Sequence, residues 1–274
     1  METRIVNQFQ CCICGRNNSE INQAHRELML CAQCGSNARF RGLMLGVMRY
    51  AFNEESKPLI KQSDRRSITA IGISDSEIYA WPLAAKLSYA NTYYHTEPQL
   101  DICDLRSIDQ YSNIDLIICS DVIEHTPLAP RKVLENMRRM LRPGGILILS
   151  APTYHLPETI EWYPDAASLE VKDCGGRHEV RWSDTSGAKH VDFRPCFHGG
   201  PGSTLEMRLI AHQDLIQAGM DAGFEVETLE FSPEIGYVWP IVPEYPGIAA
   251  PMDGRVLVLR RPHETPVKGR GYPR

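Results

Sequence analysis

Four cysteines near the N-terminus have the spacing of metal ligands. Cys11 and Cys14 form one Cys-x-x-Cys pair, Cys31 and Cys34 form a second, and a glycine follows each pair. Glycine allows the tight turn that points backbone amides at thiolate sulfurs. Four thiolates fill a tetrahedral zinc site and leave no position for water, so we expect a structural zinc ion. We take Cys12 as a spare thiol, with replacement of Cys11 through a tighter Cys-x-Cys arrangement as the alternative. The alternatives are reduced cysteines in a small packed unit and a redox Cys-x-x-Cys pair.

Three histidines are candidate general bases. His125 follows one apolar run, His155 follows the next, and His198 lies in a glycine-rich turn. Imidazole exchanges a proton near neutral pH, so each could take the proton of a hydroxyl or an amine, although a structural role stays open for each. Two further metal-site hypotheses are not favoured: a pair of Glu124 with His125, and a cluster whose spacing matches no common pattern, formed by Cys174, His178, His190 and Cys196.

A strand, a helix and a second strand would place polar side chains at one edge of a sheet. Residues 114–118 are an apolar run typical of a buried parallel strand, and Ser120 and Asp121 follow its carboxyl end. Apolar residues then recur at helical spacing up to an Arg-Pro-Gly-Gly stop, and residues 146–149 form a second apolar run. This pattern predicts a right-handed βαβ crossover in an open α/β sheet, in which ligands bind at the carboxyl ends of the strands.

The segments DVIEH (residues 121–125) and LRPGGILILSAP (residues 141–152) resemble the region after the cofactor site in class I S-adenosylmethionine (SAM)-dependent methyltransferases. The resemblance implies an α/β fold with a doubly wound, seven-stranded, Rossmann-like sheet, and SAM as the cofactor. The N-terminal pattern CxxCG…CxxCGS-x-x-R-x-R also resembles zinc-ribbon segments attached to some methyltransferases of this superfamily.

The loop after the first predicted core strand departs from the family pattern. Aligned on Gly72, the chain has Ala70 in place of the family's acidic residue, and Ser74 and Ser76 in place of two glycines. Gly72 still allows a close approach of the backbone to a ligand. We therefore expect Gly72, Ser74 and Asp75 to contact the methionine end of SAM, with Asp75 or Glu77 as the substitute for the missing acid.

Acidic residues follow the next two predicted strands. A carboxylate after the second strand can accept both hydroxyls of a ribose, and Glu97 is our candidate for that role. The resemblance assigns Asp101 to the amino group of adenine and Ile102 to the face of its ring. Ser120 and Asp121 complete the predicted cofactor site.

The sequence predicts one α/β core with additions at several places. Residues 153–205 are rich in aromatic and histidine side chains, and we expect a loop of this length to be a lid over the acceptor. Three arginines are predicted on the solvated face of a connecting helix, with contact to an anionic substrate as the alternative: Arg39, Arg41 and Arg49. The predicted divisions are 1–36 (zinc ribbon), 37–56 (connecting helix), 57–152 (SAM-binding half of the core, opening with a polar linker, 57–66), 153–205 (lid), 206–262 (C-terminal helix and closing strands) and 263–274 (flexible tail). The predicted core elements are strands at 67–73, 91–96, 100–105, 114–118, 146–149, 224–231 and 255–259, and a helix at 209–222.

Composition restricts the partners of the protein. Its 274 residues, 43% of them hydrophobic, suffice for one α/β domain with an appendage. The chain has no apolar run long enough to span a membrane, and its first ten residues lack a signal-peptide core, so we expect a cytoplasmic protein without a membrane partner. A net charge of −5 disfavours nucleic acid as a partner, because such binding grows with the number of phosphates neutralised. The oligomeric state stays open.

The sequence favours an enzyme that transfers the methyl group of SAM to an O or N atom of a small-molecule or sugar-like acceptor. The sulfonium methyl is already electrophilic, so the protein must supply in-line alignment and, for a hydroxyl or an amine, a base. Three alternatives remain. The first is an RNA base methyltransferase, since some ribosomal-RNA enzymes join a zinc module to this core. The second is a SAM-using enzyme that catalyses an intramolecular displacement. The third is a zinc-ribbon interaction protein with a degenerate cofactor pocket.

Overall fold

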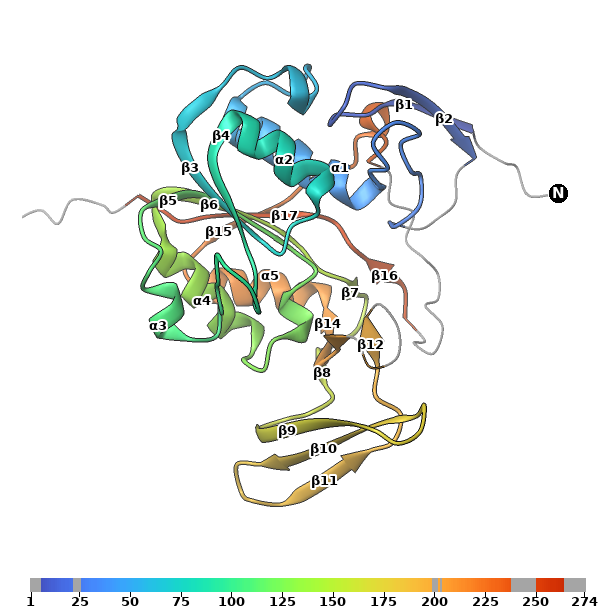
Figure 1. Cartoon of the computed structure of the whole chain (residues 1–274), viewed down its shortest axis with the longest axis vertical. Coiled ribbons are helices and arrows are strands. Elements are labelled where there is room, and N and C mark those ends of the chain that lie inside the picture. Colours follow the sequence, from blue (N-terminus) through green and yellow to red (C-terminus); the bar gives the residue numbers. More distant parts are fainter. Residues whose placement is uncertain (1–5, 22–25, 199–201, 203, 238–249, 264–274) are drawn as a thin grey trace, which may run out of the picture.

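A mixed six-stranded sheet forms the centre of the molecule (Figure 1). The computed structural model describes residues 6–21, 26–198, 202, 204–237 and 250–263. The strands of this sheet are β3 (Arg65–Ile73), β4 (Leu87–Thr92), β5 (Ile114–Ser120), β6 (Leu141–Ser150), β15 (Glu225–Thr228) and β17 (Leu257–Arg260). Their order is β15-β17-β6-β5-β3-β4. The four strands from β6 to β4 are parallel, whereas β17 is antiparallel to both of its neighbours.

Helices cover both faces of the sheet (Figure 1). One face carries α1 (Ala38–Val47) and α2 (Glu77–Lys86), and the other carries α3 (Leu105–Ile108), α4 (Pro130–Met140) and α5 (His212–Asp221). Side chains of β5 alternate between the two cores, with Leu116 and Ile118 beneath α1 and α2, and Ile117 and Cys119 beneath α4 and α5. The predicted doubly wound α/β fold is therefore confirmed.

The predicted strand, helix and strand between residues 114 and 152 all form. Pro130 occupies the first turn of α4, where its missing N–H has no intrahelical partner to lose. The helix ends at Met140, directly before the Arg-Pro-Gly-Gly sequence. Strand β6 begins earlier than the apolar run predicts, because the amide of Gly144 donates to the carbonyl of Arg261 and extends the sheet.

The strand predicted at residues 100–105 is wrong. The carboxylate of Asp101 accepts a hydrogen bond from the amide of Cys103 (2.8 Å), and that of Asp104 accepts one from Arg106 (3.0 Å) and caps α3. Such local bonds compete with a sheet ladder, so the segment forms a turn. The preceding strand is β4, which starts at Leu87 and ends at Thr92, earlier than the predicted 91–96. The central sheet accordingly has six strands in the described chain, not seven.

The helix predicted at residues 209–222 is shorter than expected. Residues Arg208–Ala211 form strand β14 instead, and α5 begins at His212. All four residues of β14 are buried, because the strand lies in the middle of a small second sheet in the order β16-β7-β14-β8. The other strands of that sheet are β7 (Thr153–Tyr154), β8 (Ile160–Glu161) and β16 (Met252–Asp253).

The segment predicted as a long loop, residues 153–205, is largely β structure. Its central part is a three-stranded antiparallel sheet that projects from the core in Figure 1, formed by β9 (Ala166–Asp173), β10 (His178–Asp184) and β11 (Lys189–Asp192). A short pair, β12 (Phe197–His198) and β13 (Thr204–Leu205), leads back to the core. We call residues 153–205 the insert. Its role as an acceptor lid stays a prediction.

The N-terminal cysteine module packs against the face of the core that carries α1. It contains the antiparallel strands β1 (Val6–Gln10) and β2 (Asn17–Ile21). The predicted polar linker also belongs to this packing, since Leu59 in the 3₁₀ turn Leu59–Lys61 is fully buried and its amide donates to the carbonyl of Cys12 (2.7 Å). The connecting helix continues as a π turn, Met48–Phe52, and the other 3₁₀ turns are Ile123–His125 and Pro233–Ile235.

None of the helices in the described residues has both the length and the apolar character needed to cross a membrane. The predicted tail from residue 264 onward lies outside the described residues.

Candidate functional site

The four predicted zinc ligands come together in one cluster, with all four sulfurs within 4.8 Å of one another. Cys11 Sγ lies 3.7 Å from Cys34 Sγ, and Cys14 Sγ lies 3.5 Å from Cys31 Sγ. Two sulfurs bound at about 2.3 Å to one tetrahedral zinc ion lie about 3.8 Å apart. The cluster therefore has the size that a zinc ion requires.

Two similar backbone turns build this cluster. The amide of Gly15 donates to the carbonyl of Cys11 (2.7 Å), and the amide of Gly35 donates to that of Cys31 (2.8 Å). Both glycines are left-handed, with φ of +81° and +74°, a conformation that strains other residues. The Ser36 hydroxyl lies 3.3 Å from Cys11 Sγ and supplies the cluster with a polar neighbour.

Arg41 is a structural residue, so its predicted place on a solvated face is wrong. The side chain is fully buried and donates to the backbone carbonyls of Ser36, Met29 (2.8 Å) and Gly236 (2.9 Å). It thereby joins the cysteine module, α1 and the segment after β15. Cys12 donates to the carbonyl of Arg41 (3.6 Å) and stands outside the cysteine cluster, and burial raises the pKa of its thiol.

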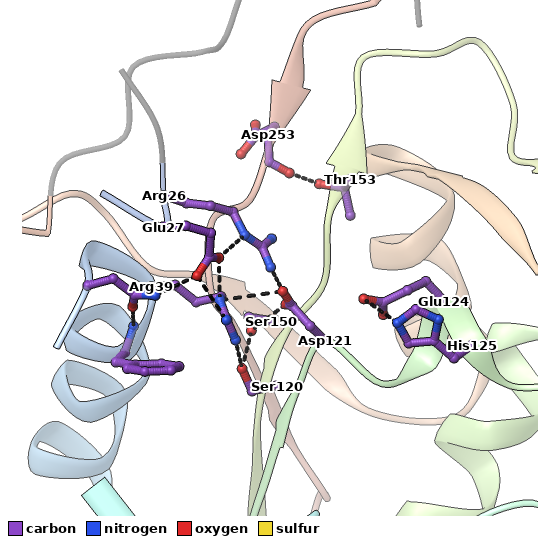
Figure 2. A network of polar contacts seen from close by, with 12 residues as sticks. Arg26, Glu27, Arg39, Ser120, Asp121, Glu124, His125, Ser150, Thr153 and Asp253 are labelled. Carbon is purple, nitrogen blue, oxygen red and sulfur yellow. Dashed lines mark hydrogen bonds and ion pairs between the residues drawn. The ribbon is translucent and has the colours of Figure 1, made fainter. Parts of the chain in front are cut away.

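Charged side chains close over the carboxyl end of β5 (Figure 2). The carboxylate of Asp121 is buried and forms ion pairs with Arg26 and Arg39. Glu27 lies between the two guanidinium groups, 2.9 Å from Arg26 Nε and 2.7 Å from Arg39 Nε, and Arg39 also donates to Ser120 Oγ. Two of the predicted cofactor residues, Ser120 and Asp121, are therefore in contact with the cysteine module and its connecting helix.

The predicted glycine loop is filled by protein side chains. Asp75 is buried, and its carboxylate accepts hydrogen bonds from the hydroxyls of Tyr79 (3.0 Å) and Tyr89 (2.8 Å). A Cβ atom at Gly72 would lie 2.1 Å from both Asp75 Oδ2 and the Tyr89 hydroxyl, so only glycine fits there. Ser74 has a left-handed φ of 55°, which a glycine would adopt without strain. Asp75 thus has partners within the protein, and its contact with a cofactor stays a prediction.

The buried Asp75 carboxyl should make stability depend on pH. Burial raises its pKa to about 7, although the two tyrosine hydroxyls act in the opposite direction. The unfolded chain loses this proton near pH 4, so between about pH 4 and 7 the folded protein holds the extra proton and the group's contribution to stability falls as pH rises. We expect Asp75→Asn to gain in unfolding free energy relative to the natural protein across that range, as measured by urea denaturation. A difference that stays constant with pH would contradict this expectation.

The residues predicted to bind adenosine lie after β4. Glu97 is exposed and accepts a hydrogen bond from the amide of Gln99 (3.1 Å), and Asp101 is half-buried. Ile102 is only 4% exposed and packs into the core beneath α4. The assigned roles of Glu97, Asp101 and Ile102 stay predictions.

The first predicted base, His155, has a buried carboxylate beside it. His155 follows β7, its side chain is 42% exposed, and its Nε2 lies 3.3 Å from Asp253 Oδ2. Burial raises the pKa of the Asp253 carboxyl, but Arg255 and His212 lower it, and the resulting pKa lies below its usual value. Arg255 donates a hydrogen bond to Asp253 Oδ2 at 2.8 Å. The backbone carbonyl of Asp253 accepts the hydroxyl of Thr153 (Figure 2). An imidazole held by an ionised, fixed carboxylate is suited to accept a proton.

The other two predicted bases lie next to each other. The ring centroids of His125 and His198 are 5.4 Å apart, with an angle of 84° between the planes. His125 Nδ1 lies 2.9 Å from the carbonyl oxygen of Leu205, and its Nε2 lies 3.6 Å from Glu124 Oε1. Burial raises the pKa of the Glu124 carboxyl to about 7.

The four residues of the hypothetical second cysteine and histidine site do not assemble. Across the described ranges, the groups able to hold a metal are the four N-terminal cysteines and the trio of Glu124, His125 and His198. His190 instead lies 2.9 Å from Asp184 Oδ2 and stacks on Trp182.

Three charged residues of this region were not predicted from the sequence: Arg26, Glu27 and Asp253. The first two lie between the cysteine pairs, where the spacing pattern pointed only to zinc. Asp253 is far from His155 in the chain, and the two meet only because β16 pairs with β7. Short-range spacing carries no signal for such a contact.

A match to a known family covers the parallel part of the core. Residues 54–147 match the family model described as a methyltransferase domain. These residues run from before β3 into β6 and include the Gly72 loop and the carboxyl end of β5. This part of the chain is therefore similar to methyltransferase domains. The resemblance of the DVIEH and LRPGG segments predicts a doubly wound α/β sheet, which the structure has with six strands in the described residues instead of seven.

Similar proteins include enzymes of several pathways. A 46-residue segment is 50% identical to a highly reducing polyketide synthase of Gibberella zeae, covering 17% of this chain and 2% of that much longer protein. Among solved structures, Streptomyces venezuelae DesVI is 13% identical, with a TM-score of 0.39 over 71% of this chain and 84% of that one. CalS10 of Micromonospora echinaspora, an amino pentose methyltransferase with bound SAM, is 12% identical, with a TM-score of 0.39 over 83% and 92%.

Proposed function

We propose that this methyltransferase transfers the methyl group of SAM to an O or N atom of a small-molecule or sugar-like acceptor, with His155 as the base. One observation carries the proposal: the half-exposed imidazole of His155 is backed by the buried, ionised carboxylate of Asp253. A hydroxyl or an amine must lose a proton during methylation, and a positioned base accelerates that loss. The net charge of −5 supports a small acceptor over a nucleic acid.

The residues at the carboxyl ends of the parallel strands fit SAM in part, because Glu97 is exposed and Asp101 half-buried, whereas Asp75 and Asp121 have partners within the protein. At the methionine end, the Asp75 carboxylate and the Tyr89 hydroxyl occupy the space next to Gly72, so these side chains would have to move for SAM to approach the backbone there. The exposed acid Glu97 after β4 would hold the ribose, and Asp101 would hold the adenine amino group. When bound, SAM supplies an electrophilic methyl group that needs no further activation.

The chain's own residues then have distinct roles. His155 would accept the proton of the acceptor on its imidazole. Asp253 would orient that ring and stabilise the imidazolium form, and Arg255 would keep Asp253 ionised, through its hydrogen bond to Asp253 Oδ2. Asp253 and Arg255 are therefore positioning residues.

The cysteine cluster would hold a structural zinc ion. Four thiolates leave no coordination position for a substrate, so the ion would stabilise the module without taking part in methyl transfer. The distances between sulfurs support this assignment.

Calorimetry with SAM and S-adenosylhomocysteine tests the cofactor. We expect one SAM bound per chain and S-adenosylhomocysteine as the product when an acceptor is present. Glu97→Gln should weaken SAM binding roughly tenfold, because the ribose hydroxyls lose a charged hydrogen-bond acceptor. The matched control is Glu170→Gln, since Glu170 is an exposed glutamate on β9 of the projecting sheet.

Three outcomes would overturn parts of this proposal. No binding at millimolar SAM would reject the enzyme and favour an interaction protein. Methylthioadenosine as the product would show an intramolecular displacement. Equal SAM affinity of Glu97→Gln and Glu170→Gln would reject the ribose role of Glu97.

A further inference from the structure

Glu124, His125 and His198 bring three potential metal ligands to one point. The first two lie on the 3₁₀ turn directly after the carboxyl end of β5, and the third lies on β12 of the insert. One ligand atom from each lies within 4.8 Å of the other two. Two imidazoles and one carboxylate form a ligand set that divalent transition ions favour.

The carboxylate of Glu124 is the most unusual member of this trio. The residue is 1% exposed, and within the part of the chain that the structure describes neither carboxylate oxygen has a hydrogen-bond partner. A buried carboxylate without hydrogen bonds is costly unless a cation or a donor compensates it. The trio has charged neighbours of both signs, since Glu206 acts on all three members, Arg26 acts on Glu124 and His198, and Arg208 acts on His125.

The orientation of His125 is fixed from the opposite side of its ring. Nδ1 lies 2.9 Å from the carbonyl oxygen of Leu205, to which it can donate its proton, and this leaves the lone pair of Nε2 facing Glu124. Histidines that bind metals commonly donate their other ring N–H in this way.

The distances also suit an ion between these groups. His125 Nε2 lies 3.6 Å from Glu124 Oε1, which is longer than a hydrogen bond. Two ligands bound at about 2.1 Å to one tetrahedral ion lie about 3.4 Å apart. The observed separation is therefore close to that of two ligands on one metal.

We propose that Glu124, His125 and His198 bind a divalent transition ion, separate from the ion of the cysteine cluster. Three protein ligands leave at least one coordination position for water or for an oxygen of a bound molecule. The ion would also join the insert to the turn after β5, since its ligands come from both (Figure 2 shows Glu124 and His125).

Cobalt binding tests this site without cofactor or acceptor. Protein that retains zinc in the cysteine cluster is titrated with Co²⁺, which binds thiolate sites less tightly than Zn²⁺ and so leaves the cluster's zinc in place. We expect one Co²⁺ per chain, with visible ligand-field bands but without the sulfur-to-cobalt charge-transfer band that thiolate binding produces. His198→Ala should weaken binding at least about tenfold, and Glu124→Gln should weaken it further.

The two variants differ in their expected effect on folding. His198 is exposed, so its loss leaves the core intact, whereas Glu124→Gln is checked by circular dichroism because the residue is buried. The control His190→Ala removes another exposed histidine of the insert, which contacts Asp184 instead. No binding at millimolar Co²⁺, or equal affinity in His198→Ala and His190→Ala, would overturn the proposal. Neither result would contradict the proposed methyl transfer, because that proposal is tested separately by the binding of SAM and by the product formed.

Discussion

Cys31→Ser is expected to release the zinc ion of the N-terminal module and to destabilise the protein strongly. The variant lacks one of four thiolates, and a neutral serine hydroxyl is a poor replacement ligand. In isolated zinc-finger peptides the ion contributes about 10–16 kcal/mol of apparent binding free energy, most of which appears as folding free energy. Cys31 is also part of the core beneath α1, so the substitution should destabilise the packing of that core as well as the module. Metal analysis should find about one zinc per chain in the natural protein and much less in the variant, with a lowered unfolding temperature.

The matched control for this experiment is Cys12→Ser. Cys12 is buried like Cys31 but lies outside the cluster, where its thiol donates to the carbonyl of Arg41. A serine hydroxyl can make the same bond, so zinc content should stay unchanged. A folded natural protein without metal, or a Cys31→Ser variant with full zinc content, would show that the cluster is a set of reduced, packed thiols.

Loss of the zinc ion should also disturb the carboxyl edge of the sheet. Arg26 and Glu27 lie between the two cysteine pairs and contact Asp121 and Arg39. If the module unfolds, the buried carboxylate of Asp121 loses one of its cationic partners, which is a costly change. The module is thus part of the predicted cofactor region and is not an independent appendage.

Local patterns in the sequence were sufficient to predict much of this structure. The Cys-x-x-Cys spacing located all four cluster residues, because two turns of the same geometry bring each pair together. The apolar runs and the helical periodicity around α4 located β5, α4 and β6, since each of these elements is buried on one side or both. In these cases neighbouring residues determine the structure.

Other features depend on contacts that are distant in the sequence. Arg41 has the helical position of a surface residue, yet the carbonyl of Gly236 and the turn before α1 enclose it. The strand expected at residues 100–105 fails because Asp101 and Asp104 bond to nearby amides, a competition that apolar content does not reveal. The pairing of His155 with Asp253 requires β16 to join β7, which no local pattern indicates.

His155→Ala is expected to lower kcat about 100- to 10,000-fold, the usual contribution of a positioned general base. The rate is measured as transfer of a labelled methyl group from SAM to whichever hydroxyl- or amino-bearing acceptor of a panel the natural protein methylates. The affinity for SAM should not change, because the imidazole would contact the acceptor and not the cofactor. Added imidazole should restore part of the rate in His155→Ala, since it can occupy the space of the missing ring and accept the proton. The control His190→Ala should retain full activity.

The role of Asp253 can be separated from that of His155 by combining two variants. Asp253→Asn should reduce kcat by itself, because an amide holds the imidazole less well and does not stabilise its charged form. If Asp253 acts only through His155, the double variant should be about as slow as His155→Ala, since groups that work as one unit are not additive. Imidazole should then restore less activity in the double variant than in His155→Ala. Additive losses in kcat would contradict a shared role, and full activity of His155→Ala would assign the base to another residue.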